Sequence, residues 1–378
     1  MSESLIFFLP LSKGGVDTFT NNYVKRIRDR KIKIVRYKNS DKLFQYIRET
    51  RNDRVEELEV FFSKYASQRS RYTLLKRIIM ENDVLICNDS FELECINYFG
   101  LKNKVVYLLH GDLTHYRNTL DLYNKSMDLV VCVSNGLKNK YSEYFLKLKF
   151  VISHPFLIGS SAGAIQNRRK LNCIFIGKFE YLKGADLYLK LVAELGENFN
   201  WTIAAISDGS ERSFLDKIPK DVNILMDQTN EEVISILKNM DILVFPSRTE
   251  GFGIAVLEAM SEGVVPIALD IPIGIPDQIV NAYNGFIIKE ESWDRAIECL
   301  KNFDRDRNLL ASMKANAIEY AKENFDGIRI AKGFVDEIDN VTIDAEKAFT
   351  VKKLPFLERL PEPLFRCLKF IHNRVKYG

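Results

Sequence analysis

The chain has 378 residues and a mass of 43.7 kDa. A chain of this length is too long for one ordinary hydrophobic core, so we expect two domains. A hydrophobic fraction of 46% is typical of a folded globular protein, and a net charge of only +3 argues against general nucleic-acid binding. No run approaches the roughly 18 to 20 apolar residues of a membrane-spanning helix. The short apolar stretch near the N-terminus lacks the basic region of a signal peptide, which predicts a cytoplasmic protein.

The cysteines and histidines predict no metal site. None of the cysteines forms a C-x-x-C pair, and three of them fall inside apolar strand-like runs, which indicates reduced core thiols. None of the four histidines has metal-ligand spacing. The six cysteines are Cys87, Cys95, Cys132, Cys173, Cys299 and Cys367.

Apolar runs and helical patterns alternate through the first half of the chain. Residues 41–81 are the exception, because they are highly charged and carry apolar residues at helical spacing, which predicts two helices with polar outer faces. A helix is predicted over 17–30. Buried strands are predicted over 5–9, 32–35, 84–87, 105–109 and 129–133.

Two turns in this half follow predicted strands and carry candidate functional residues. Gly14 and Gly15 lie between the first strand and the first helix, where glycines let the backbone pass close to a phosphate or a sugar. The absence of G-x-G-x-x-G there argues against a nicotinamide or flavin site. His110 directly follows the strand 105–109, and Gly111 comes after it.

Residues 156–170 have the composition of a linker, and the second half restarts with a strand over 173–176. The next turn carries two lysines, Lys178 and Lys183, flanked by two glycines and followed by a helix. Cations at such a turn would neutralise a nucleotide diphosphate where no metal cluster exists.

The most informative stretch is 245–270. Its pattern predicts a strand, a loop, a helix and a second strand, which together form one parallel crossover unit. The loop carries Glu250 followed by Gly251, Phe252 and Gly253, and the helix carries Glu258. Both carboxylates therefore lie near the C-terminal end of a strand, where open parallel sheets bind ligands. Carboxylates accept hydrogen bonds well from sugar hydroxyls.

This stretch follows the pattern P-S-x-x-E-G-F-G-x-x-x-x-E-A-M-x-x-G-x-P, with Val265 before Pro266 as the only departure. It resembles the donor-site motif of family 4 retaining glycosyltransferases of the GT-B fold. The resemblance implies that Glu250 contacts the transferred sugar and that Glu258 binds the ribose of the nucleotide.

The same resemblance extends to the other turns. It implies that Lys178 and Lys183 grip the donor diphosphate, with Lys178 in place of the family's arginine, and that His110 borders the sugar and the acceptor. Lys183, Glu250 and His110 are then the catalytic candidates. The predicted donor-binding residues are Gly14, Gly15, Lys178, Lys183, Glu250, Gly251, Phe252, Gly253 and Glu258.

Element order predicts an α/β chain of two doubly wound parallel-sheet, Rossmann-like domains facing a cleft. We expect an acceptor-binding domain over 1–155, a nucleotide-sugar-binding domain over 171–325 and a helical tail over 326–378. The implied activity is retaining transfer of a hexosyl group from a UDP- or GDP-linked donor, without a metal or other cofactor, to a glycan or lipid-linked acceptor in bacterial surface polysaccharide synthesis. The alternatives are a non-catalytic sugar-nucleotide-binding protein and a sugar-phosphate synthase.

The last segment, 351–378, carries seven lysines and arginines against two glutamates, with large apolar residues between them. Two predictions remain open for it. It packs back on the first domain, or it lies as a basic amphipathic helix on the anionic inner face of the membrane.

Overall fold

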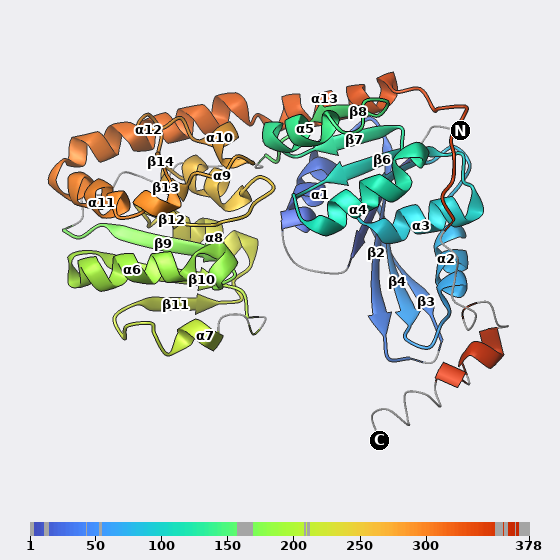
Figure 1. Cartoon of the computed structure of the whole chain (residues 1–378), viewed down its shortest axis with the longest axis horizontal. Helices are drawn as coiled ribbons and strands as arrows, with labels where there is room; N and C mark the ends of the chain where they lie inside the picture. Colours follow the sequence, from blue (N-terminus) through green and yellow to red (C-terminus); the bar gives the residue numbers. More distant parts are fainter. Residues whose placement is uncertain are drawn as a thin grey trace. The chain divides into compact units, whose positions relative to one another are not determined.

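The computed structural model describes residues 4–10, 15–42, 44–52, 55–156, 169–207, 209, 212–351, 358, 362–366 and 368–369. Its contacts divide the chain into two compact units (Figure 1). The first unit comprises 1–132, 138–153 and 331–378, and the second comprises 133–137 and 154–330. Relative to the predicted domains, residues 133–137 belong with the second unit, and the chain from Ala331 onward belongs with the first.

The first unit is built on an eight-stranded sheet in the order β3-β4-β2-β1-β5-β6-β7-β8. Every neighbouring pair is parallel except β3 with β4. The strands are β1 (Ser4–Pro10), β2 (Lys31–Ser40), β3 (Tyr46–Asn52), β4 (Val55–Ser63), β5 (Val84–Cys87), β6 (Lys104–Leu109), β7 (Leu129–Cys132) and β8 (Lys149–Ile152). The helices that begin in this half of the chain are α1 (Gly15–Arg26), α2 (Gln68–Lys76), α3 (Ser90–Phe99), α4 (Thr114–Tyr123) and α5 (Asn135–Ser142).

The structure corrects the prediction of two helices over 41–81. Most of the described part of this segment is the antiparallel hairpin of β3 and β4, and the one helix in that part is α2 at its end. Leu58, Val60 and Phe62 are buried at alternate positions of β4, as expected for a strand, and Phe61 between the last two is buried as well. Across the hairpin Tyr46 stacks on Phe61, with 4.5 Å between ring centroids, a cross-strand aromatic pair that stabilises the two strands.

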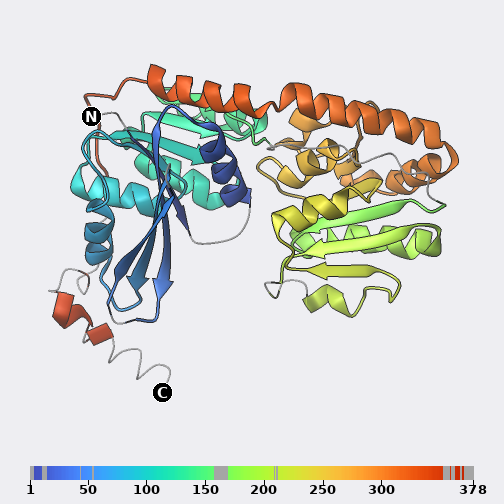
Figure 2. The same ribbon diagram turned by 180° about the vertical axis from the view of Figure 1, so that it is seen from behind.

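The second unit has a six-stranded, all-parallel sheet in the order β11-β10-β9-β12-β13-β14 (Figure 2). Its strands are β9 (Asn172–Gly177), β10 (Asn200–Ala205), β11 (Asn223–Met226), β12 (Ile242–Phe245), β13 (Val265–Leu269) and β14 (Phe286–Ile288). Its helices are α6 (Ala185–Leu195), α7 (Arg212–Leu215), α8 (Asn230–Leu237), α9 (Ile254–Ser261), α10 (Ile275–Gln278), α11 (Arg295–Arg305) and α12 (Arg307–Asn324), and α13 (Gly327–Asn340) starts here and enters the first unit.

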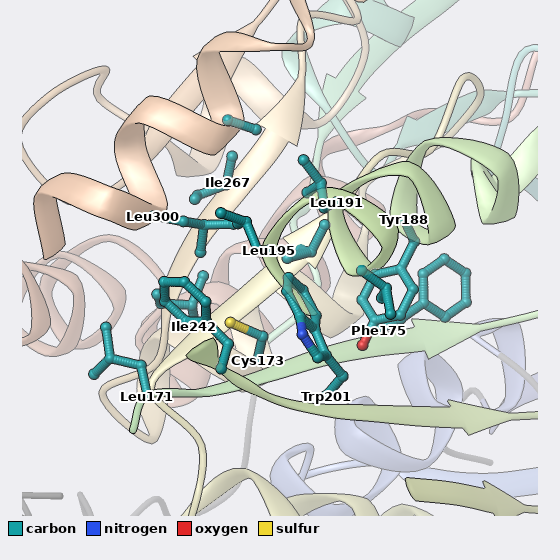
Figure 3. Packing of buried hydrophobic residues seen from close by; sticks show 14 of the residues in the cluster. Leu171, Cys173, Phe175, Tyr188, Leu191, Leu195, Trp201, Ile242, Ile267 and Leu300 are labelled. Carbon is teal, nitrogen blue, oxygen red and sulfur yellow. The ribbon is translucent and has the colours of Figure 1, made fainter. Parts of the chain in front are cut away.

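The core of the second unit explains why its strands are continuous apolar runs. Helix α6 covers β9 and β10 with Tyr188 and Leu195, which pack around Trp201 (Figure 3). The indole Nε1 of Trp201 donates a hydrogen bond to the Gly196 carbonyl at 2.9 Å, so this large ring is buried without an unpaired donor. Cys173 lies in the same cluster, and burial raises the pKa of its thiol well above the usual value.

The strand order places a topological switch point beside β9. From β9 the chain runs outward through β10 and β11, and it then returns to the opposite side of β9 as β12. The loops that follow β9 and β12 therefore leave the sheet in opposite directions and separate at this edge, which is where open α/β sheets bind ligands. The predicted two doubly wound sheets are confirmed, with antiparallel β3 as an addition.

Each unit contains a buried aspartate just before a strand of its central sheet, paired with a lysine from later in the chain. Lys314 lies on α12, and Lys347 follows α13. Asp128, before β7, accepts hydrogen bonds from the Val105 amide at 2.7 Å and from the Lys347 ammonium. Asp241, before β12, accepts from the Asn172 amide at 2.9 Å and pairs with Lys314 at 2.5 Å. Removing one member of such a pair would leave an uncompensated buried charge.

The described part of the C-terminal segment packs on the first unit. Glu358 accepts a hydrogen bond from the Gln68 amide at 2.6 Å, and Glu362 accepts from the Ser67 amide at 3.3 Å. These carboxylates lie at the N-terminus of α2, where the helix dipole favours negative charge. Phe365 is buried, whereas most of 352–378 lies outside the described residues. Among the described helices, none has the length and apolarity needed to span a bilayer.

We expect Lys347→Met to lower the free energy of unfolding by about 3 to 5 kcal/mol, because Asp128 would remain buried and ionised without its partner. Chemical denaturation monitored by circular dichroism measures the change. Lys332→Met, on the exposed side of α13, is the matched control and should leave stability nearly unchanged. A loss below 1 kcal/mol for Lys347→Met would contradict the assigned role of the buried pair.

Candidate active site

The two loops at the switch point of the second unit meet through an ion pair. The Nζ atom of Lys183, in the loop after β9, lies 2.6 Å from Oε1 of Glu250, in the loop after β12. The same Nζ donates to the Thr249 carbonyl at 3.0 Å. Both side chains are partly shielded from solvent, so this pair is screened less than a surface ion pair. The structure thus brings together the two second-unit residues predicted to be catalytic.

A glycine lets the two loops approach this closely. Gly184, after Lys183, has a φ of +76°, and a Cβ atom there would lie 2.1 Å from the carbonyl oxygen of Pro246. Only glycine fits this backbone and this gap. The Arg248 amide donates to the Leu182 carbonyl at 2.9 Å, which joins the two loops again. The position of Lys183 is therefore fixed by backbone contacts as well as by its own side chain.

Arg248, which the sequence analysis did not single out, lies at the centre of this arrangement. Its guanidinium forms two hydrogen bonds with Asp186, at 2.8 and 2.9 Å, and two with Glu290, at 2.8 and 2.6 Å. It also donates to the Tyr181 carbonyl at 2.5 Å and lies 3.9 Å from the centroid of that ring. The hydrogen bonds with Asp186, and then those with Glu290, raise its pKa. Arg248 therefore holds the lysine-bearing loop against the glutamate-bearing loop.

The glycine-rich turn after Glu250 starts α9. Gly253 caps this helix with a φ of +86°. The Gln278 side chain donates to the Phe252 carbonyl at 2.5 Å, and the Phe252 ring packs inside the unit between His154 and Phe325. The Phe252 ring is thus directed into the unit, and donor contact by Gly251, Phe252 and Gly253 stays a prediction.

Glu258, on α9, is 4% exposed. Burial raises the pKa of its carboxyl to about 7, an effect that a hydrogen bond with Asn230 partly offsets. A carboxyl group with this pKa is close to the balance between its neutral and ionised forms near neutral pH. Its location on the helix that starts from the glutamate-bearing loop agrees with the predicted position, while its role toward ribose is untested.

The remaining predicted residues are divided between the units. Lys178 directly follows β9 with an exposed side chain. His110 and Gly15 lie in the first unit, and Gly14 lies outside the described residues. His110 follows β6, its Nε2 lies 2.6 Å from Oδ1 of Asn88, and burial lowers its pKa to about 4. Most of the predicted linker, 156–170, likewise lies outside the described residues.

His154 binds Asp277 within the second unit. Its Nε2 lies 3.1 Å from Asp277 Oδ2, which also accepts from the Asn135 amide at 2.7 Å. Burial favours a higher pKa for Asp277, but the hydrogen bonds from His154 and Asn135 outweigh burial and lower it. Within the described residues, no group of three or more His, Cys, Asp or Glu side chains is arranged to hold a metal ion.

The two doubly wound α/β units have the fold of GT-B glycosyltransferases, and the second unit carries a lysine–glutamate pair at its switch point. The solved structure of HepE from Anabaena in complex with UDP-glucose matches with a TM-score of 0.72 at 16% identity, over 89% of this chain and 100% of that chain. OtsA has a TM-score of 0.71 at 10% identity, over 90% of this chain. At these identities the match establishes the fold.

Residues 164–322, which lie within the second unit, match the family model Glycosyl transferases group 1. An uncharacterized glycosyltransferase of Methanocaldococcus jannaschii is 24% identical over 82% of this chain and 90% of its own length. The capsular polysaccharide biosynthesis glycosyltransferase CapM of Staphylococcus aureus is 26% identical over 51% of this chain; the alignment spans about half of that protein, 49%. These similarities support glycosyltransferase activity.

Replacing Arg248 with lysine should lower turnover by about 100-fold, because a single ammonium cannot make the paired hydrogen bonds that set the loop geometry, and errors near 1 Å cost that much. Steady-state kinetics of sugar transfer measures the effect. Arg305→Lys, at an exposed position on α11, serves as the control. Turnover within threefold of the wild type would contradict this role for Arg248.

The raised pKa of Glu258 predicts a pH-dependent stability. Between its ordinary value of 4.5 and about 7, the folded protein keeps the proton and the unfolded chain releases it, so raising the pH favours unfolding by on the order of 3 kcal/mol in total. In Glu258→Gln the free energy of unfolding should fall less between pH 5 and pH 8 than it does in the wild type, because the titrating carboxyl is absent. Glu319→Gln, an exposed control, should keep the wild-type slope. An unaltered slope in Glu258→Gln would show that Glu258 is ionised in the folded protein.

Proposed function

We propose that the protein is a retaining glycosyltransferase that transfers a hexosyl group from a nucleotide sugar to a glycan or lipid-linked acceptor. The observation that carries this proposal is the Lys183–Glu250 pair at the switch point of the second unit. The group 1 family match over 164–322 and the similarity to a capsular polysaccharide glycosyltransferase support it. The proposed pathway is the synthesis of a surface polysaccharide, and the proposed location is the cytoplasm.

The geometry at Lys183 leaves one hydrogen-bond donor for a ligand. An ammonium group has three N–H donors, and two of them are directed at Thr249 and Glu250. We assign the third to an oxygen of the donor diphosphate. As the bond between sugar and diphosphate breaks, negative charge accumulates on the leaving group, and a fixed cation stabilises that charge more than it stabilises the bound donor.

Glu250 has a complementary part in this proposal. Its Oε1 holds Lys183, so Oε2 remains to accept a hydrogen bond from a hydroxyl of the transferred sugar. The Glu250 carboxylate would thereby set the distance between the transferred sugar and the Lys183 ammonium that binds the diphosphate. Lys178 would add a second positive charge at the end of β9, and Glu258 would accept from the ribose of a UDP- or GDP-linked donor.

Lys183→Ala should reduce turnover by about 100- to 1000-fold, the cost of removing one preorganised group that stabilises developing charge. The assay measures sugar transfer with a panel of UDP- and GDP-sugars in the presence of EDTA, because the proposed cations replace a metal. Lys190→Ala removes an exposed α6 lysine that pairs with Asp294 and is the matched control. Activity of Lys183→Ala within a few-fold of the wild type, or wild-type activity that requires added magnesium or manganese, would contradict the proposal.

Peripheral membrane contact through 351–378 is the part of the proposal that concerns a lipid-linked acceptor. If the segment lies on the membrane, the full chain should co-sediment with vesicles containing anionic lipid at low salt, and a chain ending at 350 should not. If the segment only packs on the first unit, as Glu358 and Glu362 do, neither protein should sediment and the truncated chain should melt at a lower temperature.

A further inference from the structure

Asn88 directly follows β5, and its side chain contacts β1 on one side of that strand and the residue after β6 on the other side. Its Nδ2 donates to the carbonyl oxygen of Phe8, in β1, at 2.6 Å, and its Oδ1 lies 2.6 Å from Nε2 of His110, after β6. Strands β1, β5 and β6 are consecutive in the sheet, so the three groups lie side by side at its carboxyl edge. Asn88 is buried, its contact with Phe8 is buried, and its contact with His110 is partly buried.

The orientation of the Asn88 amide follows from its partner in β1. A backbone carbonyl oxygen only accepts hydrogen bonds, so the amide atom that faces the Phe8 oxygen must be the nitrogen. The amide oxygen therefore faces His110, and an amide oxygen also only accepts. A hydrogen bond between Asn88 and His110 thus requires that Nε2 of the imidazole carry the hydrogen.

The other ring nitrogen then has the opposite character. Burial lowers the pKa of His110 to about 4, so the ring is neutral near pH 7 and has one N–H only. With that hydrogen on Nε2, Nδ1 carries a lone pair, and no hydrogen bond to Nδ1 occurs among the described residues. The Phe19 ring packs edge-on against the imidazole, with 5.2 Å between centroids, and restricts its rotation.

We propose that Asn88 is a positioning residue that fixes His110 as the tautomer with hydrogen on Nε2, so that Nδ1 accepts a hydrogen bond from a hydroxyl group of a bound sugar. The sugar part of this inference rests on the proposed function. His110 would then select ligands that have an O–H at this point and discriminate against deoxy and O-methyl sugars. Because the ring is neutral near pH 7, His110 would not protonate a leaving group there.

Nuclear magnetic resonance of the full chain tests the tautomer without any substrate. Long-range nitrogen–proton correlation spectra of uniformly ¹⁵N-labelled protein at pH 7 distinguish a protonated ring nitrogen from one with a lone pair. His110→Gln identifies the His110 resonances by their loss, and exposed His115 provides an internal control. The wild type should show one tautomer, with hydrogen on Nε2. Hydrogen on Nδ1, or an equal mixture of tautomers, would overturn the proposal even if no variant of Asn88 folds.

Two substitutions separate positioning from simple packing. Asn88→Leu keeps the approximate size and removes both hydrogen bonds, so the His110 resonances should change to a mixture of tautomers. Asn88→Asp keeps an acceptor for Nε2 and adds a negative charge, so His110 should titrate at a higher pH than in the wild type. A His110 spectrum and titration unchanged in both variants would show that Asn88 does not control the ring.

The pH dependence of sugar transfer tests the sugar contact separately from the tautomer. If sugar transfer is detected, Asn88→Asp should lose activity as the pH falls through the raised pKa of His110, because the added proton removes the lone pair from Nδ1. An Asn88→Asp profile that matches the wild type, together with the expected spectra, would overturn the sugar contact and retain the tautomer. Absence of any transfer by the wild type would instead count against the proposed function.

Discussion

The contact on which the candidate site depends is the ion pair between Lys183 and Glu250. It joins the loop after β9 to the loop after β12, the two segments that the strand order directs apart at the switch point. A lone lysine or glutamate on either loop would be a solvated side chain with many orientations. Together, with Gly184 against Pro246 and Arg248 binding Asp186 and Glu290, they form a rigid polar edge. In the proposed reaction, such an edge would let Lys183 meet the developing negative charge without reorganisation.

Much of this edge could be predicted from the sequence, because its constraints are local. The apolar runs before Lys178 and before Pro246 predicted two buried strands, and the glycines after them predicted turns. Ligands gather at the carboxyl edge of parallel strands, so residues with hydrogen-bonding side chains just after those runs were the natural candidates. The spacing of Glu250 and Glu258 placed one in the loop and one on the helix, as the structure has them.

The features that the sequence did not predict depend on partners distant along the chain. Arg248 stands in a variable position of the motif, and its partners Asp186 and Glu290 are 62 and 42 residues away. The contacts of Asn88 with Phe8 and His110 form only because β1, β5 and β6 are neighbours in the folded sheet. The segment of β3 and β4 was predicted to be helical because Leu58, Phe61 and Phe62 fit a helical period. It is a hairpin because β4 pairs with β2 on one side and with β3 on the other.

The most direct test of the central claim is a crystal structure of the protein with bound UDP or GDP, chosen as whichever nucleotide raises the melting temperature more. We expect the diphosphate to lie at the carboxyl edge of β9 and β12, with an oxygen within hydrogen-bond distance of Lys183 Nζ and the ribose hydroxyls at Glu258. A nucleotide bound elsewhere, or one whose diphosphate contacts neither Lys183 nor the loop after β9, would contradict it.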